Sequence, residues 1–394
     1  MFTSALRSLF VFPFSSNPGY AITYSEVLFY ETGLKLALDN PALVHFAYVD
    51  FRRGHPKFLP KGFANFLEYD FTSTDPKNIE RVLKYVQDNK IEVVLIMDIQ
   101  PVHPLFGALR KAGVKAIITY WAAQISSRMP AWKLVLKRLE IALSWSKVDS
   151  LIFQSRAMAD FAVLGRGVPE KMIDIVPPGI DTTCFTPIRS DYAYQAIGLP
   201  KERKIVAYSG HMEQRKGVHV LVEAAIELLK KRCRKDVCFL ICGNRDEDEI
   251  REFRSMYAGM DLDHLIRFGG YRSDLAKIYP SCYCGVIPTS GWDSFTRASL
   301  EMAASGLPVV ASRLGGLPEA VINHETGLLF EPGHADQLAD CIELLLNKPA
   351  LAEALGHRGR ERCAKDFNLE AHRGRFLTVV EARLQSLFKH QSIA

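Results

Sequence analysis

The chain has 394 residues, of which 48% are hydrophobic and 24% charged, and its net charge is +5. This length is enough for two domains of ordinary size, and the composition is typical of a soluble globular protein. No apolar run approaches the roughly 20 residues that a membrane-spanning helix needs.

The positive charge is unevenly distributed along the chain. Residues 1–189 hold 22 Lys/Arg and 17 Asp/Glu, whereas residues 190–394 hold 27 of each. The excess is too small to indicate a nucleic-acid-binding face, which would need a cluster of basic residues. It would fit an acidic acceptor or an anionic membrane surface. An ordinary solvated surface is the simpler interpretation.

The eight cysteines are scattered, without a CxxC pair or a histidine at zinc-ligand spacing. This usage is typical of a reducing compartment and gives no sign of a metal site. We therefore expect a cytoplasmic protein that binds no metal and carries no cofactor.

Short apolar runs alternate with helical segments through the first half of the chain. The expected strands are Leu9–Phe14, Val44–Val49, Val93–Met97, Ala116–Thr119, Ser150–Phe153 and Ile173–Val176. The expected helices are Tyr24–Leu38, Asp75–Val86, Leu105–Ala112, Trp132–Ser146 and Arg156–Leu164. Strands alternating with helices predict a doubly wound α/β domain with a parallel sheet.

A turn-rich segment, Pro177–Pro187, interrupts this alternation and is the expected linker between domains. A second alternating series follows it. We therefore predict an α/β fold with two doubly wound, Rossmann-like domains, residues 1–187 and 188–369. Ligands of such domains bind at the carboxyl ends of the strands, so we expect a central cleft between the two.

Helix Met129–Lys147 carries an apolar face made of Trp132, Leu136, Leu139 and Leu143. Most such faces pack into a core. However, Trp145 follows, and Lys133, Lys137, Arg138 and Lys147 lie among the apolar residues. The alternative is therefore an interfacial helix that rests on anionic headgroups.

The stretch Pro288–Gly306 carries the strongest chemical signal. An apolar strand leads into a polar turn and then into good helix formers from Arg297 onward, with Ser294 as the expected cap. Free N–H groups and the helix dipole would favour an anion there. Because Asp293 and Glu301 frame this site, a nucleotide-sugar would suit it. The other interpretation is a capped helix with a solvated Glu301.

The second half of the chain contains several motifs that follow one another in a defined order and at defined distances along the sequence. They are Val176-Pro177-Pro178-Gly179-Ile180-Asp181, Gly210 with Lys216-Gly217, Phe268-Gly270-Tyr271, Asp293 with Glu301, Gly315-Gly316-Leu317-Pro318-Glu319 and Thr326-Gly327-Leu328-Leu329. Together they resemble glycosyltransferase family 4, the retaining enzymes with the GT-B fold. The resemblance covers about half of the chain by motif and the first half only by pattern.

The resemblance implies roles for the loop that begins at Gly210. Lys216 would pair with the donor diphosphate, because a cation at a helix start calls for an anion. Where the family usually has an arginine, five residues before this lysine, the chain has His211. A histidine donates to phosphate but is charged only when protonated. Arg215 is the other candidate for the missing charge.

The resemblance also implies roles for the acidic motif. Glu301 would accept hydrogen bonds from the ribose hydroxyls, and Asp293 would contact the donor sugar. Asp293 replaces the family's usual glutamate and is shorter by one methylene, so sugar preference would differ. Ser294, Phe295 and Thr296 would offer backbone N–H groups to the sugar or the phosphate.

In the first domain the match to the family is weaker. Gly19 and Tyr20 lie where the family has a glycine-rich loop near the diphosphate, although an ordinary turn explains them equally well. Trp121 stands where a histidine commonly faces the donor sugar, and an indole can stack or donate but cannot act as a base. His103 is the nearest other candidate, and a loop histidine without a special role is the simpler interpretation.

The last helix is also part of the resemblance. Phe376, Val380, Leu384 and Leu387 recur at helical spacing, and in the family the last helix crosses back to the first domain. We therefore expect the helix at about residues 370–394 to pack on the first domain.

The expected function is a retaining glycosyltransferase. It would move a sugar from a nucleotide-sugar, a UDP- or GDP-sugar for example, to a hydroxyl of a glycan, a lipid-linked or a small-molecule acceptor. The nucleotide-sugar is a co-substrate, and neither a metal nor a nucleic-acid partner is expected. The alternatives are another GT-B enzyme, such as a phosphorylase or an epimerase, and a catalytically weakened module that binds a nucleotide-sugar. We expect a cytoplasmic protein, with peripheral contact to the inner face of the membrane as an open alternative.

Overall fold

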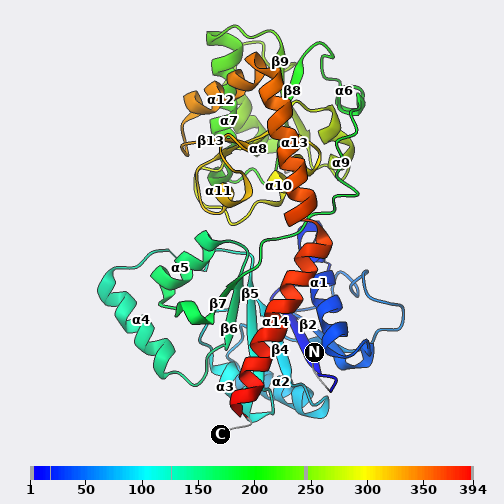
Figure 1. Ribbon diagram of the computed structural model, residues 1–394, viewed down its shortest axis with the longest axis vertical. Coiled ribbons are helices and arrows are strands. Elements are labelled where there is room, and N and C mark those ends of the chain that lie inside the picture. The colour runs from blue at the N-terminus through cyan, green and yellow to red at the C-terminus, as the bar shows by residue number, and fades with distance from the viewer. Residues whose placement is uncertain (1–3, 18, 126, 244–246, 392–394) are drawn as a thin grey trace. The chain divides into compact units, whose positions relative to one another are not determined.

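The computed structural model describes residues 4–17, 19–125, 127–243 and 247–391. The chain divides into two compact units, Met1–Val176 with Arg373–Ala394 and Pro177–His372 (Figure 1). Each unit is built on a sheet of parallel strands with helices packed beside it. The predicted α/β fold with two doubly wound domains is thereby confirmed.

The first unit contains a sheet in the strand order β3-β2-β1-β4-β5-β6-β7. Its strands are β1 (Ser8–Phe12), β2 (Val44–Tyr48), β3 (Phe66–Glu68), β4 (Val93–Met97), β5 (Ala116–Trp121), β6 (Ser150–Phe153) and β7 (Ile173–Ile175). The chain runs outward from β1 to β3 and then returns to the other side of β1. Strands β1 and β4 are therefore the point at which the strand order reverses, where ligands of doubly wound sheets bind.

Helices connect these strands. They are α1 (Tyr20–Leu36), η1 (Pro41–Leu43), α2 (Pro76–Asp88), α3 (Pro104–Lys111), α4 (Ala131–Leu143), α5 (Arg156–Arg166) and η2 (Glu170–Met172). As the sequence indicates, α2 begins after Asp75, whose carboxylate accepts from the Lys77 N–H at 3.1 Å. The core between sheet and helices is rich in aromatic rings, with Phe12 stacked on Tyr48 at 5.2 Å between centroids.

The second unit contains a sheet in the order β10-β9-β8-β11-β12-β13. Its strands are β8 (Lys204–Ser209), β9 (Val237–Cys242), β10 (Ile266–Gly270), β11 (Cys284–Ile287), β12 (Val309–Ser312) and β13 (Gly327–Phe330). Its helical elements are α6 (Tyr192–Ile197), η3 (Gln214–Lys216), α7 (Val218–Ile226), η4 (Glu227–Lys231), α8 (Glu247–Ser255), α9 (Leu275–Ile278), η5 (Tyr279–Ser281), α10 (Arg297–Ala304), α11 (Leu317–Ala320), α12 (Ala335–Asn347) and α13 (Pro349–Asp366). Here the strand order reverses between β8 and β11.

The segment expected as a free linker is instead part of the second unit, so the boundary lies at Val176 and not at Pro187. Phe185 is buried and packs near Tyr279, with 6.0 Å between their ring centroids. The Ile180 N–H donates to the Phe367 carbonyl at 2.7 Å. These contacts join residues far apart in sequence, so the turn-rich composition could not predict them.

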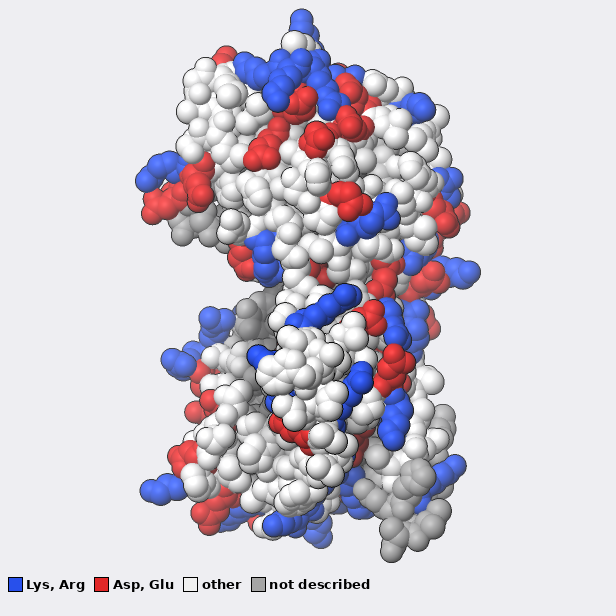
Figure 2. Space-filling model, turned by 90° about the vertical axis from the view of Figure 1, so that its left-hand side faces the viewer, with Lys and Arg blue, Asp and Glu red and all other residues white. Residues whose placement is uncertain are grey.

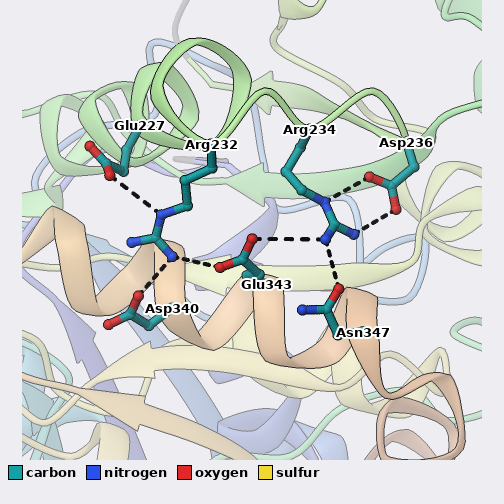
Figure 3. Close-up of polar contacts among 7 residues, drawn as sticks. All are labelled: Glu227, Arg232, Arg234, Asp236, Asp340, Glu343 and Asn347. Carbon is teal, nitrogen blue, oxygen red and sulfur yellow. Dashed lines mark hydrogen bonds and ion pairs between the residues drawn. The ribbon is translucent and has the colours of Figure 1, made fainter.

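Helix α7 ends at Ile226 and continues as the π-helical turn η4. An ion-pair network secures its end to α12 (Figure 3). Arg232 reaches Asp340 at 2.7 Å and Glu343 at 2.8 Å, while Arg234 donates to Asn347 at 2.6 Å. These partners hold the basic C-terminal end of the helix in the second unit.

The last helix, α14 (Leu369–Gln391), belongs to the first unit from Arg373 onward. Phe376, Val380 and Leu384 are completely buried in the aromatic core. Phe376 stacks on Phe29 with 5.8 Å between ring centroids. The apolar spacing therefore identified the residues of this helix that pack on the first domain.

Helix α4 does not pack as its apolar spacing first suggested. The side chains of Trp132, Leu136, Leu139 and Leu143 are 50–82% exposed. Ile141, on the opposite side, is the buried residue of this helix. Core packing was thus the wrong interpretation for this face, because the helix contacts its unit through the other side.

Candidate functional site

Two loops meet at the reversal point of the second sheet, where β8 and β11 end side by side. The Ser290 and Gly291 N–H groups both donate to the Arg215 carbonyl, at 2.9 and 3.0 Å. Gly217 lies so close to the other loop that a Cβ would come within 1.8 Å of the Pro288 carbonyl oxygen, and its φ is +71°. A glycine is therefore required there, and the contact fixes Lys216 beside the loop that follows β11.

Lys216 and Asp293 form an ion pair at the centre of this region. The Lys216 ammonium lies 2.8 Å from Asp293 Oδ2, and the two side chains are 15% and 5% exposed. Thr289 Oγ1 donates to the same carboxylate oxygen at 2.9 Å, and the Ser294 N–H donates to Oδ1 at 3.0 Å. From the sequence, Lys216 was assigned to the donor diphosphate and Asp293 to the donor sugar. In the structure the two side chains are in direct contact.

The backbone of Asp293 is held from a third loop, the one that follows β12. A Cβ on Gly315, whose φ is +55°, would lie 2.1 Å from the Asp293 carbonyl oxygen. The Gly316 N–H donates to that oxygen at 3.3 Å. The paired glycines therefore allow this loop to approach and position the carboxylate.

Arg215, the other candidate for the missing charge, contacts both loops. Its Nε donates to Glu213 at 2.7 Å, and its guanidinium donates to the Trp292 carbonyl at 3.0 Å. It therefore ties the two loops together. His211 is exposed, and its carbonyl accepts a hydrogen bond from the Tyr208 hydroxyl next to Gly210.

Glu301 lies in α10 and is almost completely buried. Burial raises the pKa of its carboxyl, and the charge of Arg297 and the hydroxyl of Tyr279 partly offset the rise. The Tyr279 hydroxyl, which carries a single proton, also lies within hydrogen-bond distance of Ser209 Oγ, 3.0 Å away at the end of β8. Glu301 thus has an internal partner in its own domain. No pattern in the sequence singled out Tyr279 or Ser209.

The turn before α10 differs from its sequence-based interpretation. The N-cap is Thr296 and not Ser294, and it makes no side-chain capping bond. The Ser294 N–H is already donated to Asp293, so it is not free for a phosphate. The Phe295 ring is buried against Phe367, with 5.3 Å between their centroids. Its ring therefore belongs to the core of the domain.

The candidates in the first unit are described within that unit alone. Trp121 is buried, its indole N–H donates to Thr119 Oγ1 at 3.2 Å, and its ring stacks on Phe153. It therefore packs inside the domain and does not present its ring to a ligand. His103 is the N-cap of α3, with its Nδ1 accepting from the Leu105 N–H at 3.3 Å.

Gly19 is the N-cap residue of α1, has φ +136° and has open space where a Cβ would stand. That conformation favours glycine. Pro18 and the side chain of Tyr20 lie outside the described part of the chain.

Sequence reasoning missed Asp98, which follows β4 at the reversal point of the first sheet. Its Oδ1 accepts from the Ala122 and Ala123 N–H groups at 2.8 and 3.1 Å. Burial raises the pKa of this carboxyl to about 6, although the two donors lower it. Its φ of +51° is a left-handed conformation that aspartate tolerates better than most residues. An acidic residue directly after a buried strand was the available signal.

The two doubly wound units give the chain the two-domain α/β architecture of the GT-B class. Residues 203–348, within the second unit, match the family model described as Glycosyl transferases group 1. The similarity to this family thus lies wholly within the second unit.

Two curated relatives carry the same name. The chain is 29% identical over 199 residues to the D-inositol 3-phosphate glycosyltransferase of Corynebacterium diphtheriae, covering 49% of this chain and 46% of the relative. It is 32% identical over 186 residues to the protein of that name from an Arthrobacter species, covering 47% and 44%. The chain thus spans about half the length of the curated relatives it matches.

Solved structures resemble nearly the whole chain. A glycosyltransferase from Rickettsia africae has a TM-score of 0.79 at 17% identity, covering 97% of this chain and 99% of that one. The Anabaena protein HepE, solved in complex with UDP, has a TM-score of 0.74 at 14% identity, covering 96% and 100%. At these identities the likeness establishes the fold.

Proposed function

We propose that this protein is a family 4 glycosyltransferase that transfers a sugar from a nucleotide-sugar to an acceptor hydroxyl with retention of configuration. The observation that carries the proposal is the Lys216–Asp293 pair at the reversal point of the second sheet. It lies in a domain that matches the group 1 glycosyltransferases. The names of the relatives support the same activity.

The pair retains the capacity to bind a ligand. An ammonium group has three N–H donors, and Asp293 takes one of them. The remaining donors can bind diphosphate oxygens, and this charge stabilises the diphosphate as it departs. Asp293 has about four acceptor sites, three of which are occupied by Lys216, Thr289 and Ser294. The last can accept from a hydroxyl of the donor sugar.

Lys216 supplies a positive charge for the diphosphate, and we propose that transfer needs no metal. UDP is the first nucleotide to test, because HepE was solved with it. The acceptor is a glycan, a lipid-linked or a small-molecule hydroxyl, and D-inositol 3-phosphate, which the names of the curated relatives contain, is the first small molecule to try. Peripheral membrane contact is a separate proposal that rests on helix α4.

The test is calorimetric titration with UDP, GDP and ADP, followed by assays of UDP-, GDP- and ADP-sugars for donor hydrolysis and transfer, with and without EDTA. We expect one nucleotide to bind and its sugar to turn over without added metal. NMR of the product would report the anomer, and an inverted product would overturn the retaining mechanism. Failure of every nucleotide to bind would overturn the proposal as a whole.

A catalytically weakened binding module is the second candidate. The exposed His211 stands where related enzymes have an arginine, so the loop has one permanent charge fewer. Nucleotide binding without any hydrolysis or transfer would favour the module. His211→Arg distinguishes the two further, since restored turnover in this variant would show that the missing charge had limited the reaction.

A further inference from the structure

Helix α4 turns its apolar side away from the protein. Trp132, Val135, Leu136, Leu139 and Leu143 are all at least half exposed. At about 100° per residue they fall within an arc of about 100°, with Ile141 opposite. We call these five residues the α4 ridge. A surface helix normally buries such a face, and here the buried residue is Ile141.

Basic side chains flank the α4 ridge. On the helical wheel Lys133 lies on one side of it and Arg138 on the other, while Lys137 lies farther round, toward Ile141. Figure 2 looks onto this side of the first unit, where surface without charged residues is bordered by Lys and Arg. Glu140 is the acidic residue of the helix, and it pairs with Lys137. The helix therefore presents an apolar centre with a net positive rim.

Two tryptophans extend this surface. Trp132 is part of the ridge, with the Lys133 ammonium 5.2 Å from its ring centroid. Trp145, just beyond the helix, is 59% exposed, and the Lys111 ammonium lies 5.1 Å from its ring. Tryptophan beside a basic group is typical of the boundary between headgroups and acyl chains.

Lys147 has a different role from the one the sequence suggested. Its ammonium donates to the Ile141 and Ala142 carbonyls at 2.8 and 3.2 Å, so it caps the end of α4. It is therefore not counted among the groups available to a partner.

We propose that the α4 ridge docks the first unit on an anionic lipid surface. The helix has 13 residues, about 20 Å at 1.5 Å per residue, and would lie in the membrane plane. In the described residues no helix is long and apolar enough to cross a bilayer. This inference does not depend on the proposed transferase activity.

Charge complementarity favours a lipid surface over a second copy of this chain. A two-fold contact through the α4 ridge would bring Lys133 and Arg138 of both copies to its edges. Like charges in contact disfavour that arrangement. Anionic headgroups would instead pair with the basic rim while the ridge enters the acyl boundary.

The experiment is cosedimentation of the full chain with phosphatidylcholine vesicles, with or without phosphatidylglycerol, at low and moderate salt. We expect binding to the anionic vesicles that weakens with salt. Leu136→Ser with Leu139→Ser should reduce the partition coefficient at least tenfold, and so should Lys133→Glu with Lys137→Glu. Ile188→Ser, at an exposed apolar residue of the second unit, is the matched control and should bind normally.

Tryptophan emission gives a second readout. Anionic vesicles should shift the emission to the blue. Because Trp132 and Trp145 are the exposed tryptophans of this surface and Trp121 is already buried, Trp132→Phe should reduce the shift and Trp145 should account for part of what remains. Absence of binding at low salt would overturn the proposal. So would normal binding by the Leu136/Leu139 variant, or a dimer in solution that this variant dissociates.

Discussion

Helices α4 and α14 both belong to the first unit, and the sequence gives both the same apolar spacing. In α14 the spaced residues Phe376, Val380 and Leu384 are completely buried. In α4 the corresponding face is at least half exposed along its length. The spacing of apolar residues thus determines which side chains share a face, but not whether that face meets the protein.

The polar residues of the two helices explain the difference. On α14, Arg383 donates to Asp174 at 2.6 Å and Arg373 pairs with Glu31 at 2.7 Å, so these two arginines are paired inside the unit. On α4, Lys133 and Arg138 flank an apolar face that points outward. The positions of charged residues around an apolar stripe are therefore informative about its partner.

The largest loss of stability should come from a substitution in the buried helix, α14. Phe376→Ala removes a fully buried ring and should lower the free energy of unfolding by about 3–5 kcal/mol. Leu139→Ala in α4 serves as the matched exposed variant and should cost far less. Denaturant unfolding of both would measure the difference. Equal losses would show that α4 is packed like α14.

The second unit contains a buried ion pair, Lys216–Asp293, to which we assign both a structural and a functional role. Lys216→Ala leaves the Asp293 charge buried without its cation. This should lower the free energy of unfolding by an amount near the lower end of about 3–5 kcal/mol. It should also weaken nucleoside diphosphate binding about tenfold to a hundredfold, since a charge-assisted contact is worth roughly 1.5–3 kcal/mol.

The double variant Lys216→Met with Asp293→Asn separates these two effects. It removes the unpaired charge, so stability should largely return, whereas diphosphate affinity should stay low. Thermal unfolding and calorimetry of both variants provide the test. Recovery of affinity together with stability would mean that Lys216 acts only through the fold.

Asp98 provides a smaller effect with a defined pH dependence. Because its pKa is about 6 in the folded protein and 3.8 is its ordinary value, the folded state binds the proton more tightly. Stability from this group is present below about pH 4 and is lost as the pH rises through 6. Asp98→Asn keeps the acceptor for Ala122 and Ala123 and should raise stability at pH 7 by about 1–3 kcal/mol.

A series of unfolding curves between pH 4 and pH 7 would show this. The wild-type protein and Asp98→Asn should converge at the acidic end and separate as the pH rises. Parallel curves across the range would rule out titration of Asp98. A loss of activity without a change in stability would place this residue in the ligand site of the first unit.

Much of the fold could be predicted because its central strands are continuous apolar runs. Val93–Met97, for example, was predicted residue for residue. The domain boundary was not, because burial of Ile180 and Phe185 depends on contacts with residues near 367. The amino-acid composition of a short segment does not indicate contacts with residues so far away in the sequence.

The candidate site, like the fold, could be predicted only in part. The motifs indicated Lys216 and Asp293 one by one, but their ion pair could not be predicted, because they are 77 positions apart in the sequence. Tyr279 could not be found at all, because it reaches Ser209 through the packing of η5 against the end of β8. The type of a residue indicates which chemistry it can perform. Which residues it contacts across a sheet can be seen only in the folded structure.

Glu301 tests whether a buried carboxylate serves the ligand or the domain. Glu301→Gln keeps the shape and removes the charge, so we expect weaker donor binding with an almost unchanged melting temperature. Calorimetry with the nucleotide and a thermal melt measure both quantities. If stability falls strongly while affinity stays normal, the link through Tyr279 is the main role of this residue.

The smallest expected effect is on the exposed face with which the comparison began. Leu136→Ser with Leu139→Ser should change the free energy of unfolding by no more than about 0.5 kcal/mol per site, because each side chain is at least half exposed. A clear loss would mean that the α4 ridge is covered by protein in solution. Near-neutral stability combined with lost vesicle binding would instead show that these leucines face a partner, since nothing inside the fold would then account for an apolar face on this side of the helix.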